Sequence, residues 1–285
     1  MAEYRIIACD LDGTLVGTDG RISGENYEAI RSLREKGIEF VPATGRAFGE
    51  MPTDLKECPD IRYIMYSNGS VIFDKATGKR RTFGIKHALL CRVLDLLGEY
   101  DTHILLHAEG DSHFDAAKDT DAYFAHCNMS EWWMNYVRGC NVRREDFAEY
   151  AYGLCEAEMA CVFFDTLGHR AEAKERLQKM GLRVTSTAEY NLEIFSETCG
   201  KGNTLRVLAE MLGCDISQTV AVGDSLNDLS MIEAAGLGIA MSNAIDLLKE
   251  KADLVICSND EHAAKYILEH VDSWDAVPHP AKGTF

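Results

Sequence analysis

Two aspartates stand two residues apart immediately after the first apolar run of the chain. Asp10 and Asp12 follow Tyr4–Cys9, whose nearly unbroken apolar character is typical of a strand buried on both faces. In a parallel sheet, ligands bind beyond the carboxyl ends of the strands, so the two carboxylates can converge on one point there. Taken alone, the pair fits a ligand site and an Asx-rich turn about equally. It does not fit an EF-hand loop, because Gly13 is the fourth residue of the motif and that loop needs glycine at its sixth.

Four more polar clusters follow predicted strands or begin a predicted helix. The segments 43–46 (Ala-Thr-Gly-Arg) and 67–70 (Ser-Asn-Gly-Ser) follow the next two apolar runs. Lys201 begins a helix, and 223–228 (Gly-Asp-Ser-Leu-Asn-Asp) follows a later strand. Each cluster has a structural explanation of its own, such as a helix cap, a surface charge or a turn. All five are predicted at one edge of one sheet, and together they favour a shared site.

These groups suit phosphoryl transfer. Several carboxylates at one edge repel one another unless a hard cation lies among them, and Mg²⁺ prefers one or two carboxylates together with water and phosphate oxygens. The hydroxyl and backbone amides of 43–46 form a phosphate pocket at a helix start. Lys201 adds a compact positive charge. One aspartate can attack phosphorus to form an aspartyl-phosphate, while a second moves a proton to the leaving oxygen and later takes one from water.

The composition of the chain limits the kinds of molecule that it can bind. The 285 residues include 29 Lys plus Arg and 46 Asp plus Glu, a formal charge of −17, which argues against non-specific binding to nucleic acid or to a membrane surface. An anionic substrate would need a metal ion or a local basic cluster to overcome this field. No secretory or membrane-spanning apolar run is present in the sequence, and the ten cysteines occur singly without CxxC pairs. We therefore expect a cytoplasmic protein that binds no nucleic acid and no membrane.

The elements that must position these residues alternate between strand and helix at both ends of the chain. This alternation predicts a doubly wound, Rossmann-like parallel sheet. Helices are predicted over 26–35, 201–212, 228–235, 244–251 and 261–270. Strands are predicted over 4–9, 38–43, 62–66, 219–222, 237–241 and 254–256.

A second α/β module is predicted between the two halves. Its predicted helices are 87–97, 119–134 and 170–180, and its predicted strands are 104–107, 159–164 and 182–186. We expect residues 1–82 and 192–285 to form the core and 83–191 to form an inserted α/β cap domain. The tail from Asp272, with Pro278 and Pro280, shows no periodicity and is expected to pack loosely.

The order and spacing of the motifs resemble those of haloacid dehalogenase-like (HAD) phosphatases of the Cof-type branch, subfamily IIB, along the whole chain. The chain departs from the family pattern at two small places, Thr198-Cys199-Gly200 before the helix that begins at Lys201, and Ser242 before Asn243. The resemblance implies a role for each matched residue. The implied roles are nucleophile for Asp10; acid/base for Asp12; phosphate binding for Thr44, Gly45, Lys201 and Asn227; Mg²⁺ binding for Asp10, Asp12 (through its backbone oxygen) and Asp224; and a supporting shell for Asp228, Arg46, Asn68 and Gly69.

The same resemblance implies a magnesium-dependent phosphomonoesterase that acts on small cytosolic phosphate esters through an aspartyl-phosphate. Sugar phosphates are the first expectation, with pyridoxal phosphate or flavin mononucleotide behind them. A phosphomutase of the same superfamily stays open as an alternative, as does a phospho-accepting signalling module or a phosphosugar-binding module. Motif order, chain length and the insertion argue against a signalling module, and no acid of the motif set is missing, as it usually is in catalytically silent relatives.

The insertion carries no strong motif. Trp132 and Trp133 point about 100° apart on a helix, so one of them is expected in the core. The histidines at 103, 107, 113 and 126 lack zinc-site spacing and are interpreted as structural or surface residues. The acidic run 156–158 is interpreted as a solvated face.

Overall fold

The computed structural model describes residues 4–276, which form two compact units. We call residues 4–45, 57–81 and 200–276 the core unit, and residues 46–56 and 82–199 the inserted unit. The core unit contains five parallel strands in the order β16-β15-β14-β1-β2, so the predicted doubly wound α/β class is confirmed. The bounds of these strands are β1 Ile6–Cys9, β2 Glu39–Pro42, β14 Thr219–Gly223, β15 Leu237–Met241 and β16 Leu254–Ile256.

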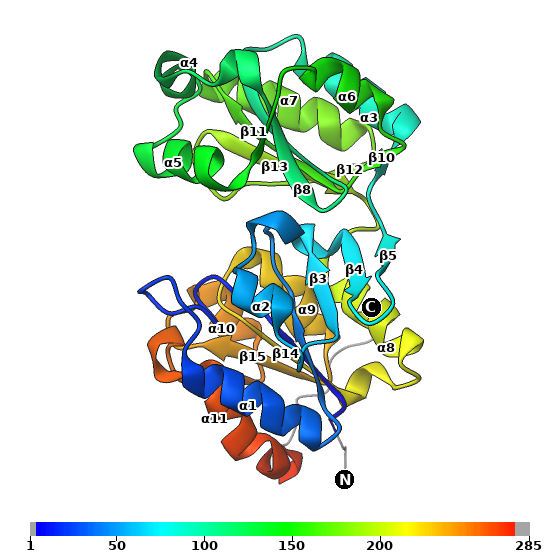
Figure 1. The fold of residues 1–285 in the computed structure, drawn as a ribbon, viewed down its shortest axis with the longest axis vertical. Coiled ribbons are helices and arrows are strands. Elements are labelled where there is room, and N and C mark those ends of the chain that lie inside the picture. Colours follow the sequence, from blue (N-terminus) through cyan, green and yellow to red (C-terminus); the bar gives the residue numbers. More distant parts are fainter. Residues whose placement is uncertain (1–3, 277–285) are drawn as a thin grey trace. The chain divides into compact units, whose positions relative to one another are not determined.

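Helices cover both faces of the core sheet, with α1 and α11 on one side and α8 and α9 on the other (Figure 1). Helix α1 begins where the Ser23 hydroxyl accepts a hydrogen bond from the backbone amide of Asn26, and it buries Ala29, Ile30 and Leu33 at helical spacing. The helices are α1 Gly24–Glu35, α8 Lys201–Met211, α9 Leu229–Ala234, α10 Asp246–Lys251 and α11 Ala263–His270. Short 3₁₀ turns are η2 Ser67–Gly69, η4 Ile216–Gln218, η5 Leu226–Asp228, η6 Asn259–Glu261 and η7 Val271–Ala276.

The predicted third strand forms a separate hairpin. β3 (Tyr63–Tyr66) pairs antiparallel with β4 (Val71–Asp74), β5 (Lys79–Thr82) follows, and β3 meets the main sheet at an isolated bridge between Ala43 and Met65. This bridge is parallel, so β3 runs in the predicted direction beside the end of β2, but it lies outside the five-stranded sheet. After β3, three successive positive φ angles in the turn 67–69 reverse the chain direction, which makes β4 antiparallel to β3.

The inserted unit contains a six-stranded sheet in the order β12-β13-β11-β7-β8-β9, mostly antiparallel. Helices α3, α6 and α7 cover one face, and α4 and α5 cover the other. The bounds of the strands are β6 Ile85–Lys86, β7 Thr102–Ala108, β8 Asp111–Asp115, β9 Val142–Arg144, β10 Glu156–Ala157, β11 Met159–Phe164, β12 Leu182–Thr185 and β13 Asn191–Ser196. Those of the helices are α2 Thr53–Glu57 (ending in the core unit), α3 His87–Leu97, α4 Asp121–His126, α5 Glu131–Cys140, α6 Phe147–Gly153 and α7 Leu167–Lys179, with 3₁₀ turns η1 Phe48–Glu50 and η3 Ala116–Lys118.

One predicted helix of the insertion is two helices. The apolar pattern of 119–134 continues through a break between α4 and α5, where Asn128 has a φ of 55° and Ser130 caps α5 by accepting from the amide of Trp133. A residue in the left-handed region cannot continue an α-helix, so the chain turns. Within α5, Trp133 packs against Phe163 and the neighbouring Trp132 is 63% exposed, as the helical angle between them requires.

The unit boundaries follow the strand pairing. Asn191, at the predicted end of the cap, is the first residue of β13, which pairs with β11 and β12, so the inserted unit continues to Cys199. The segment 46–56 belongs to the same unit, where the backbone amide of Gly49 donates to the carbonyl of Gly110.

The acidic run 156–158 is not a solvated face throughout. Glu158 is buried, and its carboxylate accepts a hydrogen bond of 2.8 Å from the backbone amide of Gly110. The carboxylate thus satisfies a turn amide inside the unit, while the partly exposed Glu156 pairs with Lys86 at the surface. The interpretation of Glu158 as solvated is wrong, because its carboxylate accepts a hydrogen bond from a turn amide inside the unit.

His103 lies inside the inserted unit against aromatic rings. Its ring stacks on Phe124 with centroids 4.7 Å apart, and neither ring nitrogen has a hydrogen-bond partner among the described residues. Burial, reinforced by the positive charge of Lys118, lowers the pKa of His103 from 6.5 to about 4. The folded protein therefore keeps this imidazole neutral.

We expect His103→Leu to stabilise the protein and to flatten its stability in mild acid. As the pH falls below 6.5, His103 binds a proton in the unfolded chain, whereas in the folded chain it binds one only near pH 4. The free energy of unfolding therefore falls between pH 6.5 and pH 4, by at most about 3 kcal/mol. Leucine has no polar atom to desolvate and removes this loss. Urea denaturation at pH 7.5 and pH 5 checks it; an equal pH dependence in both proteins would contradict it.

The last described residues pack on the core. In η7, Trp274 is buried with its ring edge-to-face against Tyr4, at 6.4 Å between centroids. The expectation of loose packing therefore fails for Trp274, whereas Asp272 and Ser273 are exposed. Pro278 and Pro280 lie outside the described residues. All ten cysteines are free thiols. Among the described helices, none has both the length and the apolar character that crossing a bilayer requires.

Candidate active site

Three elements of the core unit end or begin at one place. Asp10 directly follows β1, Asp224 directly follows the neighbouring parallel strand β14, and Lys201 is the first residue of α8. The backbone amide of Asp10 donates to the carbonyl of Val222 at 2.9 Å, so the ladder between the two strands continues to the first acid. The expected carboxyl edge of the sheet therefore carries the polar groups.

Lys201 is the buried centre of this cluster. Its Nζ lies 2.6 Å from Asp10 Oδ1 and 2.6 Å from Asp228 Oδ1, and its side chain has no exposed surface. The alternative of a solvated surface lysine is thereby excluded. A charge buried in this way is stable only when partners such as these two carboxylates accept its hydrogen bonds.

Asp228 connects the lysine to the backbone of the neighbouring loop. Its second oxygen accepts hydrogen bonds of 3.0 Å from the amides of Asp224 and Ser225. A side chain on Gly223 would exclude this arrangement, because a Cβ there would lie 2.4 Å from Asp228 Cγ. The carboxylate therefore orients the loop that presents Asp224.

Asp224 is held by two hydroxyls and approached closely by a glycine. Thr14 Oγ1 donates to Asp224 Oδ1 at 3.2 Å, and Ser225 Oγ donates to Oδ2 at 3.0 Å. Gly13 has a φ of +77°, and a Cβ at this position would lie 2.5 Å from Asp224 Oδ2. The turn after the first strand thus requires glycine for both its conformation and the space it leaves.

We expect Gly13→Ala to destabilise the protein by about 1–3 kcal/mol. The new methyl group strains the backbone and displaces the Asp224 carboxylate. Gly20→Ala is the matched control, because Gly20 has the same φ of +77° and a Cβ there would meet nothing within 4 Å. Thermal unfolding of both variants checks the expectation, and equal losses of stability would contradict the role of the close approach to Asp224.

Burial and mutual repulsion dominate the electrostatics of the acids. Burial, followed by the neighbouring Asp228 carboxylate, raises the pKa of Asp10 well above its usual range, against the opposing effect of Lys201. The same two causes, in the same order, raise the pKa of Asp224. Burial alone would lower the pKa of Lys201, but the Asp10 and Asp228 carboxylates outweigh it and raise that pKa. The cluster therefore carries more negative charge than its one lysine neutralises.

This donor set fits a hard divalent cation. Asp10, Asp224 and Asp228 each offer a carboxylate oxygen, and these oxygens lie within 4.8 Å of one another. Oxygen ligands and a surplus of negative charge are what Mg²⁺ needs. Asp12 lies on the turn after Asp10 with an exposed side chain, and its backbone forms a bridge with Val16.

The segment after β2 lies beside the turn after β3. Thr44 is buried, its amide donates to the carbonyl of Met65, and its carbonyl accepts from the amide of Asn68. Asn68 accepts through Oδ1 from Asn227 Nδ2 at 3.0 Å, and a Cβ on Gly45 would lie 3.1 Å from the same oxygen. The predicted residues of these segments are therefore neighbours in the core unit.

Two of the remaining predicted residues differ in placement. Gly69 packs against the start of α8, where a Cβ on it would lie 2.8 Å from the carbonyl carbon of Gly200. Arg46 instead belongs to the inserted unit, and its guanidinium donates to the carbonyl of Glu50. The structure thus does not group Arg46 with the core cluster.

The side-chain contacts of Thr14 and Thr204 have no counterpart among the sequence predictions. The Thr204 hydroxyl donates to the carbonyl of Gly69, and Asn243 Nδ2 donates to the carbonyl of Gly13 at 2.8 Å. Thr204 stands three residues after Lys201 on the first turn of a helix, a spacing that places both on one face and could have signalled it.

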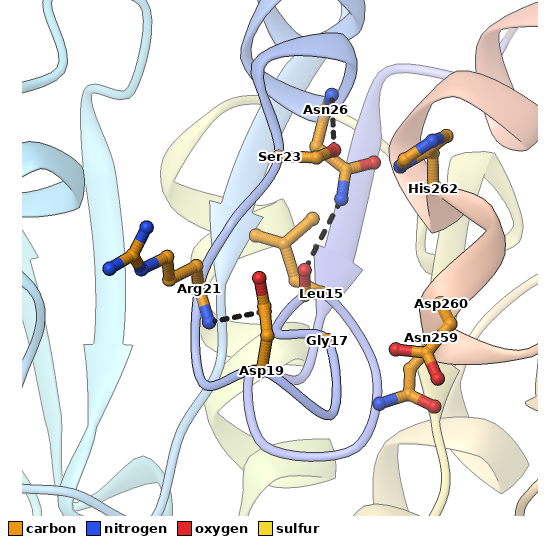
Figure 2. A pocket seen from close by; sticks show the side chains of 9 residues that line it. All are labelled: Leu15, Gly17, Asp19, Arg21, Ser23, Asn26, Asn259, Asp260 and His262. Carbon is orange, nitrogen blue, oxygen red and sulfur yellow. Dashed lines mark hydrogen bonds between the residues drawn. The ribbon is translucent and has the colours of Figure 1, made fainter.

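A polar cavity of about 120 Å³ lies beside the loop that follows Asp10 and Asp12 (Figure 2). Asn26 Nδ2 donates to the carbonyl of Leu15 at one wall. Asn259, which also lines the cavity, donates through Nδ2 to the carbonyl of Val16. The amide and hydroxyl of Thr18 donate to Asp260. These hydrogen bonds fix the loop to α1 and η6, and so they hold the turn that carries the first two acids.

Comparisons with known proteins agree on one family. A family model described as haloacid dehalogenase-like hydrolase matches residues 7–268. The chain is 31% identical to phosphatase YwpJ of Bacillus subtilis, over 94% of this chain and 99% of that protein. It is 32% identical to 5-amino-6-(5-phospho-D-ribitylamino)uracil phosphatase YwtE of the same organism, over 94% and 98%. A solved haloacid dehalogenase-like hydrolase from B. subtilis is similar with a TM-score of 0.76 at 28% identity, over 94% and 99%.

Proposed function

The chain belongs to the haloacid dehalogenase-like hydrolases and is a phosphatase. From this premise we propose that it is a Cof-type (subfamily IIB), Mg²⁺-dependent phosphomonoesterase of small cytoplasmic phosphate esters. HAD phosphatases generally use Mg²⁺. The observation that carries the proposal is the buried Lys201, hydrogen-bonded to Asp10 and Asp228 and set beside Asp224. A lysine and several carboxylates at the end of a sheet supply the charge distribution that a transferring phosphoryl group needs.

In this proposal Asp10, Asp224 and the backbone oxygen of Asp12 would hold the metal ion. When bound, Mg²⁺ supplies positive charge that screens the carboxylates from the phosphate and favours the ionised form of Asp10. Lys201 holds Asp10 at one oxygen and adds positive charge beside the phosphoryl oxygens. Thr44, Gly45 and Asn227 contribute the hydroxyl, amide and side-chain amide groups that bind the phosphate.

The reaction then proceeds in two displacements. A carboxylate oxygen of Asp10 attacks phosphorus, the bond from phosphorus to the ester oxygen breaks, and Asp12 gives a proton to the departing alcohol. Water next attacks the phosphorus of the aspartyl-phosphate while Asp12 takes its proton. The bond between phosphorus and Asp10 breaks, which releases inorganic phosphate and restores both acids.

Sugar phosphates are the substrate class that we place first, with pyridoxal phosphate and flavin mononucleotide after them. One support is the relative YwtE, whose name gives a phosphate ester on a ribityl chain, at 32% identity over nearly the full length of both proteins. Another is the strongly acidic composition, which is unsuited to polyanionic macromolecules.

A phosphate-release screen tests the proposal. The purified protein is incubated with a panel of sugar phosphates, pyridoxal phosphate and flavin mononucleotide, with Mg²⁺ or with a chelator. We expect inorganic phosphate to appear with Mg²⁺ for at least one ester and not with the chelator. Release that is equal with the chelator would contradict the metal dependence. An isomeric phosphate ester without free phosphate would instead identify a phosphomutase.

A further inference from the structure

A second group of metal-ligating side chains lies in the inserted unit, within that unit's own contacts. Asp101 directly precedes β7, Asp165 directly follows β11, and His126 is the last residue of α4. One oxygen of each carboxylate and one ring nitrogen of His126 all lie within 4.8 Å of one another. From this arrangement we propose that Asp101, His126 and Asp165 form a site for a divalent transition-metal ion such as Zn²⁺.

The distance between His126 and Asp101 is compatible with a shared ion. His126 Nε2 lies 3.4 Å from Asp101 Oδ2, which is longer than the 2.7–3.2 Å or so of a good N–H···O hydrogen bond. Two ligands of a tetrahedral Zn²⁺, each about 2.1 Å from the ion, stand about 3.4 Å apart. The pair is therefore spaced as two ligands of one ion would be.

The three ligands are held by fixed backbone. Thr102 and Phe164 are partners in the antiparallel ladder, so Asp101 and Asp165 flank it side by side, and the amide of Asp165 donates to the carbonyl of Asp101 at 3.3 Å. Asn128 Nδ2 donates to the carbonyl of Asp165 at 2.8 Å, which ties the end of α4 to the same strand. A site assembled in this way needs little ordering when the ion binds.

Asp165 is also oriented by a second histidine. His169 Nδ1 lies 2.7 Å from Asp165 Oδ1, which also accepts a hydrogen bond of 2.8 Å from the amide of Thr166. Hydrogen bonds of this kind to a ligating carboxylate are a regular feature of metal sites. The Asp165 side chain is 12% exposed and that of His126 is 50% exposed, so the cluster is held on one side and open to loading from solvent on the other.

The donor set selects the class of ion. An imidazole nitrogen with two carboxylates suits Zn²⁺ and its neighbours in the transition series, whereas Mg²⁺ and Ca²⁺ prefer oxygen ligands throughout. Three protein ligands leave room for water at the remaining positions. The ion would join α4 to the ends of β7 and β11, and so it would stabilise the side of the sheet that α4 and α5 cover.

Thermal unfolding of the full chain with Zn²⁺ tests the site. The measurement uses excess Mg²⁺ to occupy the catalytic acids and a phosphine reductant to keep the thiols reduced. We expect Zn²⁺ to raise the Tm by at least about 3 °C, since an ion that binds the folded state alone stabilises it. His126→Gln and Asp101→Asn, both at exposed positions, should each remove at least about two thirds of this rise while leaving Mg²⁺-dependent phosphatase activity unchanged.

His262→Gln is the matched control, because His262 Nε2 lies 3.9 Å from a single carboxylate, that of Glu25. It should keep the full Zn²⁺ effect. Substitution by Co²⁺ gives a second readout, with visible d–d absorption expected and no thiolate charge-transfer band. The proposal is overturned if Zn²⁺ gives no rise in Tm, if His126→Gln and His262→Gln respond alike, or if the Co²⁺ spectrum reports thiolate ligands.

Discussion

Asp10→Asn should lower phosphatase turnover by at least about 10⁴-fold while the protein stays folded. The amide is close to the carboxylate in size but is a poor nucleophile, so no bond to phosphorus forms. In the parent protein Lys201 donates to Asp10 Oδ1 at 2.6 Å. In the variant it can still donate to the amide oxygen of the asparagine side chain. Loss of one carboxylate also relieves the repulsion with Asp228 that helps to raise the pKa of Asp10.

Steady-state phosphate release and thermal unfolding, measured on the same preparation, check this expectation. Asp54→Asn, at an exposed position of α2, is the matched control and should leave both quantities unchanged. If Asp10→Asn kept activity within about tenfold of the parent, the nucleophile would have to be another group. If it lost activity and stability together, the turnover loss would report unfolding instead of chemistry.

The sequence predicts the core well because its strands are short apolar runs set between polar or glycine residues. The predicted bounds of β15 and β16 agree with the structure, and α8 begins at the predicted Lys201. Since parallel strands present their carboxyl ends at one edge, the convergence of Asp10, Asp224 and Lys201 follows from the order of the elements. Their chemical roles stay predictions that the experiments above address.

Other features depend on contacts between residues far apart in the sequence. The burial of Glu158 depends on the backbone amide of Gly110, which is 48 residues away, and the periodicity of the sequence does not indicate this contact. Likewise, no zinc-type spacing marks His126, because Asp101 precedes β7 and Asp165 follows β11, far from His126 in the sequence. The break between α4 and α5 depends on the positive φ angle of Asn128. The apolar pattern of the sequence continues across this residue, so it gives no sign of the break.

Lys201→Met should destabilise the core by about 3–5 kcal/mol and lower turnover by at least about a thousandfold. In the parent protein, Lys201 Nζ lies 2.6 Å from a carboxylate oxygen of Asp10 and of Asp228. Methionine fills the buried space of the lysine stem but leaves these two carboxylates without their shared cation. Urea denaturation gives the free energy of unfolding, and phosphate release gives the turnover. Since the pair is buried, added salt should change the stability difference little.

The cost of this substitution should also depend on pH. Without Lys201, the folded-state pKa of Asp10 lies still further above that of the unfolded chain, because burial and the Asp228 carboxylate already raise it and the opposing effect of Lys201 is lost. A carboxyl group with a raised pKa in the folded state destabilises that state when ionised, and the penalty fades as pH falls through the folded pKa. The stability difference between parent and Lys201→Met should therefore be larger at pH 8 than at pH 5.

A double variant separates a lost ion pair from lost packing. Asp228→Asn removes one of the two stranded charges, and its amide oxygen can still accept from the amides of Asp224 and Ser225 that Asp228 Oδ2 now serves at 3.0 Å. In the Lys201→Met background it should recover at least about 1 kcal/mol of stability, whereas in the parent it should cost stability. Turnover should not recover in the double variant, since the positive charge beside the phosphate is still absent. Equal effects of Asp228→Asn in both backgrounds would mean that the stability lost with Lys201 came from packing, and the buried charge cluster would not be the feature that holds this end of the sheet together.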